Sequence, residues 1–543
     1  MLIPTKNQNS IYILFLISLF NKLTIYFFII FFSHITFPQK GELKYGEEMY
    51  IESYDPITSK NIDNYASFRL SHLIYEQLVY VDNQGNVLPL LAEKWSIIKN
   101  GYKIKFFIRN NIKWHDGKFF SLDDVIFTFN SFKDKQESIA PHLTALLKNL
   151  DTIYISEGRS IVFEFNNFEP DLMRIFSNIP ILPKHIFSNS KIEESILFQN
   201  PIGTGPFKFE FRSNDRTRVR LVAFESYYDK INISRITAFT NVDPELSVLT
   251  LLTKSIDLKV QIRAKDIARL ETEGSFEINA FNSLKIYLFS FNFNNPLLKN
   301  INIRKAMVYG FNRLETFNNI YLGKGVLLSG PFSPGSWGYN PNVKVIPFDT
   351  IKANDQLQLA NCLDTDGDGI RELNKKRLQF ELLIPVGKQD AGDDFTIQVA
   401  DIFKSQMKRI GIEIIIRREE WRKFLSLLRK KEFDIAYHSI VFDEKSDISP
   451  YFFSKGNSNF SNYVNQEVDK LFELFFNSND PEQLRTIYYR LHYILANDLP
   501  AIFLWTPEQF TAYIRHKIRG DIYFDPFKFF TPKTREWIID EKY

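Results

Sequence analysis

Between residues 378 and 442 the chain alternates short apolar runs with longer amphipathic segments, and this alternation restricts the fold more than any other feature. In one longer segment, Trp421, Phe424, Leu425 and Leu428 share the spacing of a single helical face. Strands that alternate with helices of this length form parallel βαβ units. The predicted strands are 378–384, 412–416 and 433–442, and the predicted helices are 394–410 and 421–431. We therefore expect an α/β protein.

Asp443 directly follows the last of these predicted strands. Ligands of open α/β sheets bind outside the carboxyl ends of strands, where a charge avoids the cost of burial within the sheet. The local sequence Asp-Glu-Lys-Ser-Asp is equally typical of a solvated loop. Asp443 is therefore a candidate ligand contact, with a loop residue as the alternative.

The chain has 543 residues, which is more than one hydrophobic core usually serves, so we expect two or three lobes. Hydrophobic residues make up 44% and charged residues 24%, as in globular proteins. The first forty residues contain three lysines and no acid, and they account for the whole formal net charge of +3. The remaining body is neutral, which argues against a nucleic-acid partner.

The N-terminus carries two apolar runs, 11–20 and 25–32, behind the positive charge of Lys6. This pattern predicts a long, divided signal peptide and hence an exported, periplasmic protein. An uncleaved membrane anchor over 11–32 is the alternative, although Lys22 would lie inside the span. No cysteine follows the apolar run to carry a lipid.

The residues that catalysis or metal binding would need do not form a recognisable motif. Cys362 is the one cysteine, so the chain has no internal disulfide, and no two histidines have the helical spacing of metal ligands. The sequence contains no nucleophile elbow, phosphate loop or HExxH motif. We therefore expect neither an enzyme nor a cofactor.

Several motifs in order along the chain resemble one family. Residues 75–132 contain LPLLAEKW, then a strand, then WHDG and a helix, and later segments read PIGTGPF (201–207) and SGPFSPGSWGYNP (329–341). Together with the segment 469–505, which ends in NDLPAIFLW, this series is similar to the family 5 extracellular solute-binding proteins. These are the oligopeptide- and dipeptide-binding components of ABC importers.

The resemblance implies an α/β, three-lobed periplasmic binding protein fold with mixed sheets, in which two main lobes joined by a hinge enclose the ligand. Residues 1–40 would be the signal peptide or anchor. Lobe I would comprise 41–57, 199–286 and 509–543, lobe II would be 58–198, and lobe III would be 287–508.

The implied function is the capture of a peptide or other small solute and its delivery to an ABC permease in the inner membrane, by a monomer without cofactors. The alternatives are a non-peptide solute, such as a nickel chelate or an oligosaccharide, and a surface or sensor protein without a transporter. Hydrolysis is a remote third class.

The resemblance also implies ligand contacts. Asp443 matches an aspartate that pairs the α-amine of the peptide, and Trp421 matches a tryptophan that lines the groove, with helix–sheet packing as its alternative role. The implied ligand-binding residues are Asp443, Trp421, Tyr437, Ile440, Tyr50 and Phe503. The chain departs from the family at Ser439-Ile440, where many members have Gly-Trp, and at Leu428 and Tyr437, where some members have arginines for the ligand carboxylate.

One string, DTDGDG, resembles a calcium loop: Asp364, Asp366 and Asp368 have the spacing of its first three ligands, and Gly369 follows. The twelfth position, where a bidentate glutamate should stand, is Lys375. The sequence therefore predicts a turn without bound calcium.

Overall fold

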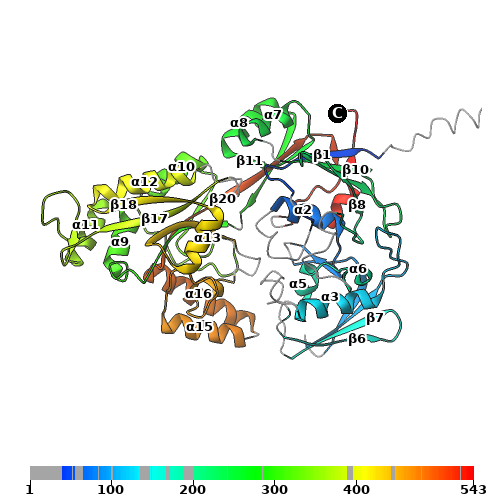
Figure 1. Cartoon of the computed structure of the whole chain (residues 1–543), viewed down its shortest axis with the longest axis horizontal. Coiled ribbons are helices and arrows are strands. Elements are labelled where there is room, and N and C mark those ends of the chain that lie inside the picture. The colour runs from blue at the N-terminus through cyan, green and yellow to red at the C-terminus, as the bar shows by residue number, and fades with distance from the viewer. Residues whose placement is uncertain are drawn as a thin grey trace, which may run out of the picture. The chain divides into compact units, whose positions relative to one another are not determined.

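The computed structural model describes residues 40–51, 53–54, 65–82, 85–98, 102–134, 147, 149–166, 172–188, 200–240, 243–283, 285–334, 336–387, 395–441, 447–478, 480–525 and 528–543. Residues 42–543 form one compact unit (Figure 1). Within these ranges no helix has the length and hydropathy needed to span a bilayer. The N-terminal apolar runs lie outside the described residues.

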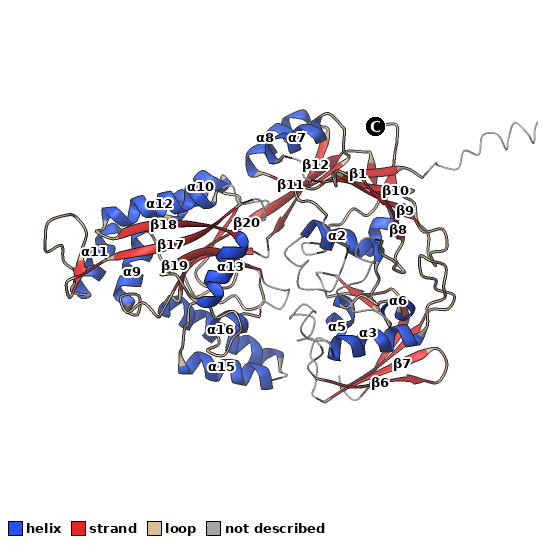
Figure 2. Ribbon diagram, viewed as in Figure 1, coloured by secondary structure: helices blue, strands red, loops and turns tan. Residues whose placement is uncertain are grey.

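A twelve-stranded mixed sheet organises the compact unit (Figure 2). Its main path runs in the order β18-β17-β19-β13-β20-β11-β1-β10-β9-β8, and β12 and β14 also pair with β20. The strands are β1 (Glu42–Gly46), β8 (Phe207–Arg212), β9 (Arg218–Ala223), β10 (Arg235–Phe239), β11 (Leu258–Ile262), β12 (Phe276–Asn282), β13 (Lys285–Phe291), β14 (Gly325–Leu327), β17 (Gln379–Val386), β18 (Glu413–Glu420), β19 (Ile435–Val441) and β20 (Ala501–Ile514).

Strand β20 belongs to both halves of this sheet. Its first half pairs antiparallel with β13, where Tyr287 lies opposite Trp505. Its second half pairs antiparallel with β11 and β12, where Leu258 lies opposite Tyr513. One long strand therefore connects the βαβ region to the region around β1, as Figure 1 shows.

The predicted βαβ units are confirmed. β17 pairs parallel with both β18 and β19, and the helices α12 (Thr396–Arg409) and α13 (Trp421–Lys430) connect these strands in sequence. The apolar stripe of α12 lies in the same core as the sheet, with Val399, Phe403 and Met407 fully buried. Gly411 ends the α12 segment at a φ of 82°, a left-handed conformation that glycine adopts without strain.

A smaller four-stranded sheet has the order β4-β5-β7-β6 and its own core. Phe106, Phe129, Phe163 and Phe176 contact one another edge-on or at a tilt in this core. Its elements are β4 (Ala92–Ile98), β5 (Lys103–Ile108), β6 (Leu150–Ser156), β7 (Ser160–Phe165), α3 (Leu122–Asp134), α5 (Leu172–Asn178) and α6 (Lys184–Phe187). The start of α3 is capped, because Asp124 accepts the Ser121 amide at 2.8 Å.

The separate cores agree with a mixed α/β, lobed fold, while the exact lobe boundaries stay a prediction. The remaining elements are α2 (Tyr65–Ile74), β2 (Val79–Val81), β3 (Val87–Pro89), α7 (Pro244–Leu252), α8 (Ala264–Glu273), α9 (Ile301–Gly310), α10 (Arg313–Tyr321), α11 (Thr350–Leu359), β15 (Glu372–Leu373), β16 (Lys376–Arg377), α14 (Ser449–Phe452), α15 (Gln466–Asn477), α16 (Pro481–Asp498), β21 (Ile518–Arg519), η4 (Pro532–Glu536) and β22 (Ile538–Ile539).

Candidate functional site

The carboxyl ends of β1 and β19 point toward the same middle stretch of β20. β19 runs antiparallel to β13, which runs antiparallel to β20, so β19 and β20 have the same direction. β1 runs parallel to β11, which is antiparallel to β20, so β1 has the opposite direction. Since β13 pairs with the first half of β20 and β11 with the second, the two carboxyl ends approach each other near the middle of β20. The ends of strands are the preferred place for a ligand.

Trp421 lies at the carboxyl end of the neighbouring strand β18. It is the first residue of α13 and directly follows the last residue of β18. β18 and β19 are both neighbours of β17 and all three run parallel, so their carboxyl ends lie about 10 Å apart at one edge. Asp443, two residues after the end of β19, lies outside the described residues. The structure thus places Trp421 at the carboxyl end of β18, and the ligand contacts of both Trp421 and Asp443 stay predictions.

The other predicted contacts differ in the surface they offer. Tyr50, shortly after β1, is 37% exposed, and Trp421 is half-buried, with its ring stacked on Phe424. In contrast, Tyr437, Ile440 and Phe503 are only 1–3% exposed. Tyr437 packs in the core beneath β19 beside Tyr287, while Ile440 and Phe503 share a core on the opposite face. Their side chains hold the sheet in place here, and their direct contact with a ligand stays a prediction.

Four buried charges lie at the carboxyl end of β1, which the sequence analysis did not identify. Arg69 of α2 donates two hydrogen bonds to Glu47, at 2.8 Å and 2.5 Å. Lys259 of β11 lies 3.1 Å from Glu48, and burial lowers the pKa of this lysine while Glu48 raises it. Two acids and two bases balance each other, as buried charges require. These pairs anchor the segment that carries Tyr50.

His115 connects the WHDG and PIGTGPF motifs. Its Nδ1 accepts the Gly203 amide at 3.2 Å, and its Nε2 lies 2.9 Å from the carbonyl oxygen of Gly205. Because an amide can only donate, Nδ1 carries no proton and Nε2 donates, so the bonded imidazole is neutral. Burial lowers the pKa of His115 to about 4, against the opposing effect of the Gly205 carbonyl. The two motifs are therefore parts of one structural clamp.

The bonding of His115 predicts a loss of stability in acid. The folded pKa is about 4 and the unfolded value about 6.5, so the contribution of His115 is present above pH 6.5 and is lost as the pH falls toward 4. We expect about 3 kcal/mol of free energy of unfolding to be lost over this window. Urea unfolding of the wild type and of His115→Gln, which does not titrate, isolates the effect from other groups. A difference between the two proteins that stays constant from pH 7 to pH 4 would contradict it.

Glu76, at 3% exposure, is a second buried polar residue at the junction between α2 and the smaller sheet. Its Oε1 accepts hydrogen bonds from Tyr227 at 2.6 Å and Tyr228 at 2.7 Å. Burial raises the pKa of Glu76 to about 7, although the two tyrosine hydroxyls lower it. The carboxyl group therefore serves the packing of this junction, and it titrates near neutral pH.

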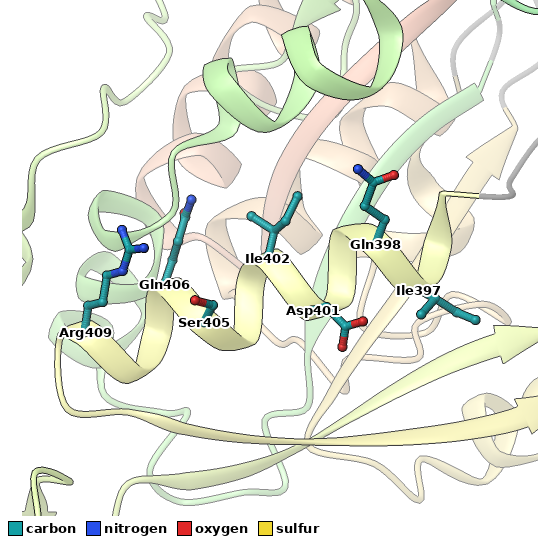
Figure 3. Close-up of a pocket in the computed structure, with 7 residues that line it drawn as sticks. All are labelled: Ile397, Gln398, Asp401, Ile402, Ser405, Gln406 and Arg409. Carbon is teal, nitrogen blue, oxygen red and sulfur yellow. The ribbon is translucent and has the colours of Figure 1, made fainter.

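A shallow pocket lies on the solvent side of α12 (Figure 3). Gln406 at this surface accepts the backbone amide of Asn312 at 2.7 Å, so it ties α12 to α10. The pocket is lined by Ile397, Gln398, Asp401, Ile402, Ser405, Gln406 and Arg409. None of these is a predicted ligand contact.

Comparisons with known proteins match nearly the whole described unit. The family model "Bacterial extracellular solute-binding proteins, family 5 Middle" matches residues 86–462. The oligopeptide-binding protein AppA of Bacillus subtilis is 26% identical over 464 residues, 82% of this chain and 83% of that protein. The dipeptide-binding protein of Escherichia coli is 23% identical over 485 residues, 82% of this chain and 86% of that protein.

Solved structures share the fold. B. subtilis AppA in complex with a nonapeptide has a TM-score of 0.78 at 24% identity, and covers 93% of this chain and 100% of its own. NikZ from Campylobacter jejuni in complex with Ni(L-His) has a TM-score of 0.77 at 24% identity, and covers 92% of this chain and 100% of its own. The predicted lobed fold is therefore confirmed.

Proposed function

From the premise that the chain belongs to the bacterial extracellular solute-binding proteins of family 5, we propose that it captures peptides in the periplasm and delivers them to an ABC permease in the inner membrane. The observation that carries this proposal is the match to peptide-binding relatives over about four-fifths of both chains. Domain closure around the ligand is a common transition in binding proteins.

The strand ends supply the physical basis for peptide binding. An extended peptide can pair its backbone with strand edges, which gives affinity without strict dependence on side chains. We place the peptide near the middle of β20, between Tyr50 and Trp421, whose side chains are partly exposed. Asp443 at the end of β19 would meet the ammonium group.

A nickel chelate is the second candidate ligand. NikZ, whose structure holds Ni(L-His), has the same fold with a TM-score of 0.77. The departures at Ser439-Ile440 and Tyr437 alter the wall in which some family members hold a peptide. A chelate would use fewer backbone contacts than a peptide and would depend less on Asp443.

Analysis of the native ligand separates these candidates. Protein purified from the periplasmic fraction should release peptides on denaturation, which mass spectrometry would detect, and metal analysis should find no stoichiometric nickel. N-terminal sequencing of the same sample tests export and shows whether the segment before residue 41 is removed. Release of nickel with histidine, or an untouched cytosolic chain, would contradict the proposal.

A further inference from the structure

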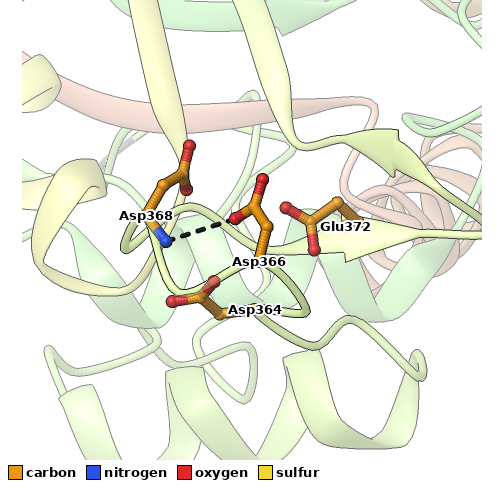
Figure 4. A group of neighbouring side chains, drawn as sticks. All are labelled: Asp364, Asp366, Asp368 and Glu372. Atoms are coloured by element: carbon orange, nitrogen blue, oxygen red, sulfur yellow. Dashed lines mark hydrogen bonds between the residues drawn. The ribbon is translucent and has the colours of Figure 1, made fainter.

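Four carboxylates gather in the loop between α11 and β17. Asp364, Asp366, Asp368 and Glu372 each offer one oxygen, and these four oxygens lie within 4.8 Å of one another (Figure 4). Like charges at such distances repel one another. Backbone amides of the loop donate hydrogen bonds to Asp364, Asp366 and Asp368 and offset part of this repulsion. None of the four carboxylates belongs to the residues proposed to contact the peptide.

The backbone of the loop explains why Glu372 joins the group. Leu363 and Glu372 exchange backbone hydrogen bonds at 3.1 Å and 2.8 Å, which closes the loop and begins the β15–β16 hairpin. Asn374 and Lys375, with φ of 52° and 64°, form the tight turn of this hairpin. Lys375, the expected twelfth position, is therefore in the turn, and the fourth carboxylate comes from the ninth position instead.

The two carboxylate oxygens of Glu372 differ in their hydrogen bonds. Its Oε2 accepts hydrogen bonds from the amide and hydroxyl of Thr365, at 2.9 Å and 2.8 Å. Its Oε1 is buried and accepts no hydrogen bond from the described residues. Glu372 as a whole is only partly exposed, in contrast to the three exposed aspartates. A buried carboxylate oxygen without a donor, beside three other carboxylates, is the environment that a bound cation would explain.

The basic residues nearby do not neutralise the cluster. Arg377 pairs with Asp368 and lies 3.4 Å from Glu413. Arg371 instead donates to the Cys362 carbonyl oxygen and to Asn354, both at 3.0 Å. Four acids thus face one guanidinium group.

We propose that Asp364, Asp366, Asp368 and Glu372 bind a calcium ion, contrary to the expectation from Lys375. Hard oxygen ligands at this density suit Ca²⁺, and the spacing of the three aspartates is that of a calcium loop. The ion would connect α11 to the β15–β16 hairpin and would not contact the peptide. Exposed calcium sites in extracellular proteins have dissociation constants of about 10⁻⁴–10⁻³ M, which is the range we expect here.

Calorimetry of the metal-free full-length protein with CaCl₂ tests the proposal. We expect one site in this range, a rise in Tm with Ca²⁺ that a chelator reverses, and weaker binding of Mg²⁺. Glu372→Gln removes the charge, keeps an acceptor for Thr365, and should weaken binding about tenfold or more. Asp366→Asn should act in the same way.

Asp401→Asn, an exposed aspartate on α12, is the matched control and should bind Ca²⁺ like the wild type. The proposal is overturned if no heat and no Tm shift appear up to about 10 mM Ca²⁺, ten times the weakest expected constant. It is also overturned if Glu372→Gln binds as tightly as the control. Circular dichroism of each variant shows whether it folds, and Asp366→Asn decides the matter if Glu372→Gln does not.

Discussion

Replacing Asp443 by alanine is expected to weaken the binding of a peptide with a free α-amine about thirty-fold to several thousand-fold. A peptide held between lobes loses the water around its ammonium group, and attraction to a fixed carboxylate is then much stronger than in bulk water. Removing one partner leaves the other buried and unpaired, at a cost of about 2–5 kcal/mol, which gives this range of affinity. Isothermal titration calorimetry with one peptide measures it directly.

The same peptide with an acetylated N-terminus is the matched control for Asp443. It should bind the wild type poorly, and Asp443→Ala should hardly change its affinity, because no ammonium remains to pair. The fold should be intact in the variant, since β19 ends at Val441, two residues before Asp443 in the sequence. Equal affinity of the wild type for the free and acetylated forms would show that Asp443 is only a loop residue.

The sequence predicted the βαβ region well because its signals are local. The apolar spacing in α12 and α13 and the glycine at 411 specify elements over a few residues, and each has a buried face in the structure. The position of Trp421 at the carboxyl edge follows from the same order of strands and helices. Parallel pairing of β17, β18 and β19 is then the expected outcome.

The residues that the sequence missed depend on contacts between distant segments. Arg69 and Glu47 are 22 residues apart in the sequence, and Lys259 and Glu48 are 211 residues apart. No local sequence pattern therefore predicts that these charges are buried together. His115 reaches glycines 88 and 90 residues away. In the acidic loop, Lys375 occupies the twelfth position counted from Asp364, where a calcium loop has its glutamate. The backbone bridge between Leu363 and Glu372, which brings Glu372 close to the three aspartates, is visible only in the structure.

The end of α2 is a further case, because the apolar residues of the sequence continue to Leu78 while the helix ends at Ile74. The apolar pattern continues past that point, and Leu78 is indeed buried. However, the Gly205 amide donates to the Ile74 carbonyl oxygen at 2.8 Å, so a distant segment caps the helix there. Helix ends set by tertiary contacts leave no periodic signal in the helix itself.

Gly203→Ala should therefore cost more than about 4 kcal/mol of free energy of unfolding, in the range of severe single substitutions. A Cβ at Gly203 would lie 1.9 Å from the carbonyl oxygen of Ile74 and 2.7 Å from its carbon. Both are backbone atoms, so no side chain can rotate away to relieve the overlap. The segment must move from α2, which breaks the Gly205–Ile74 hydrogen bond and both contacts of His115.

Gly158→Ala is the control for Gly203→Ala. Gly158 has a φ of 67°, and nothing lies within 4 Å of an added Cβ, so alanine there should cost only the strain of a left-handed residue, about 1–2 kcal/mol. Urea unfolding followed by circular dichroism compares the two. Gly205→Ala, whose Cβ would lie 2.6 Å from the Leu73 carbonyl oxygen, should also be severe and serves if Gly203→Ala cannot be purified. If Gly203→Ala unfolds at the same urea concentration as Gly158→Ala, the PIGTGPF segment does not pack against the end of α2 as described.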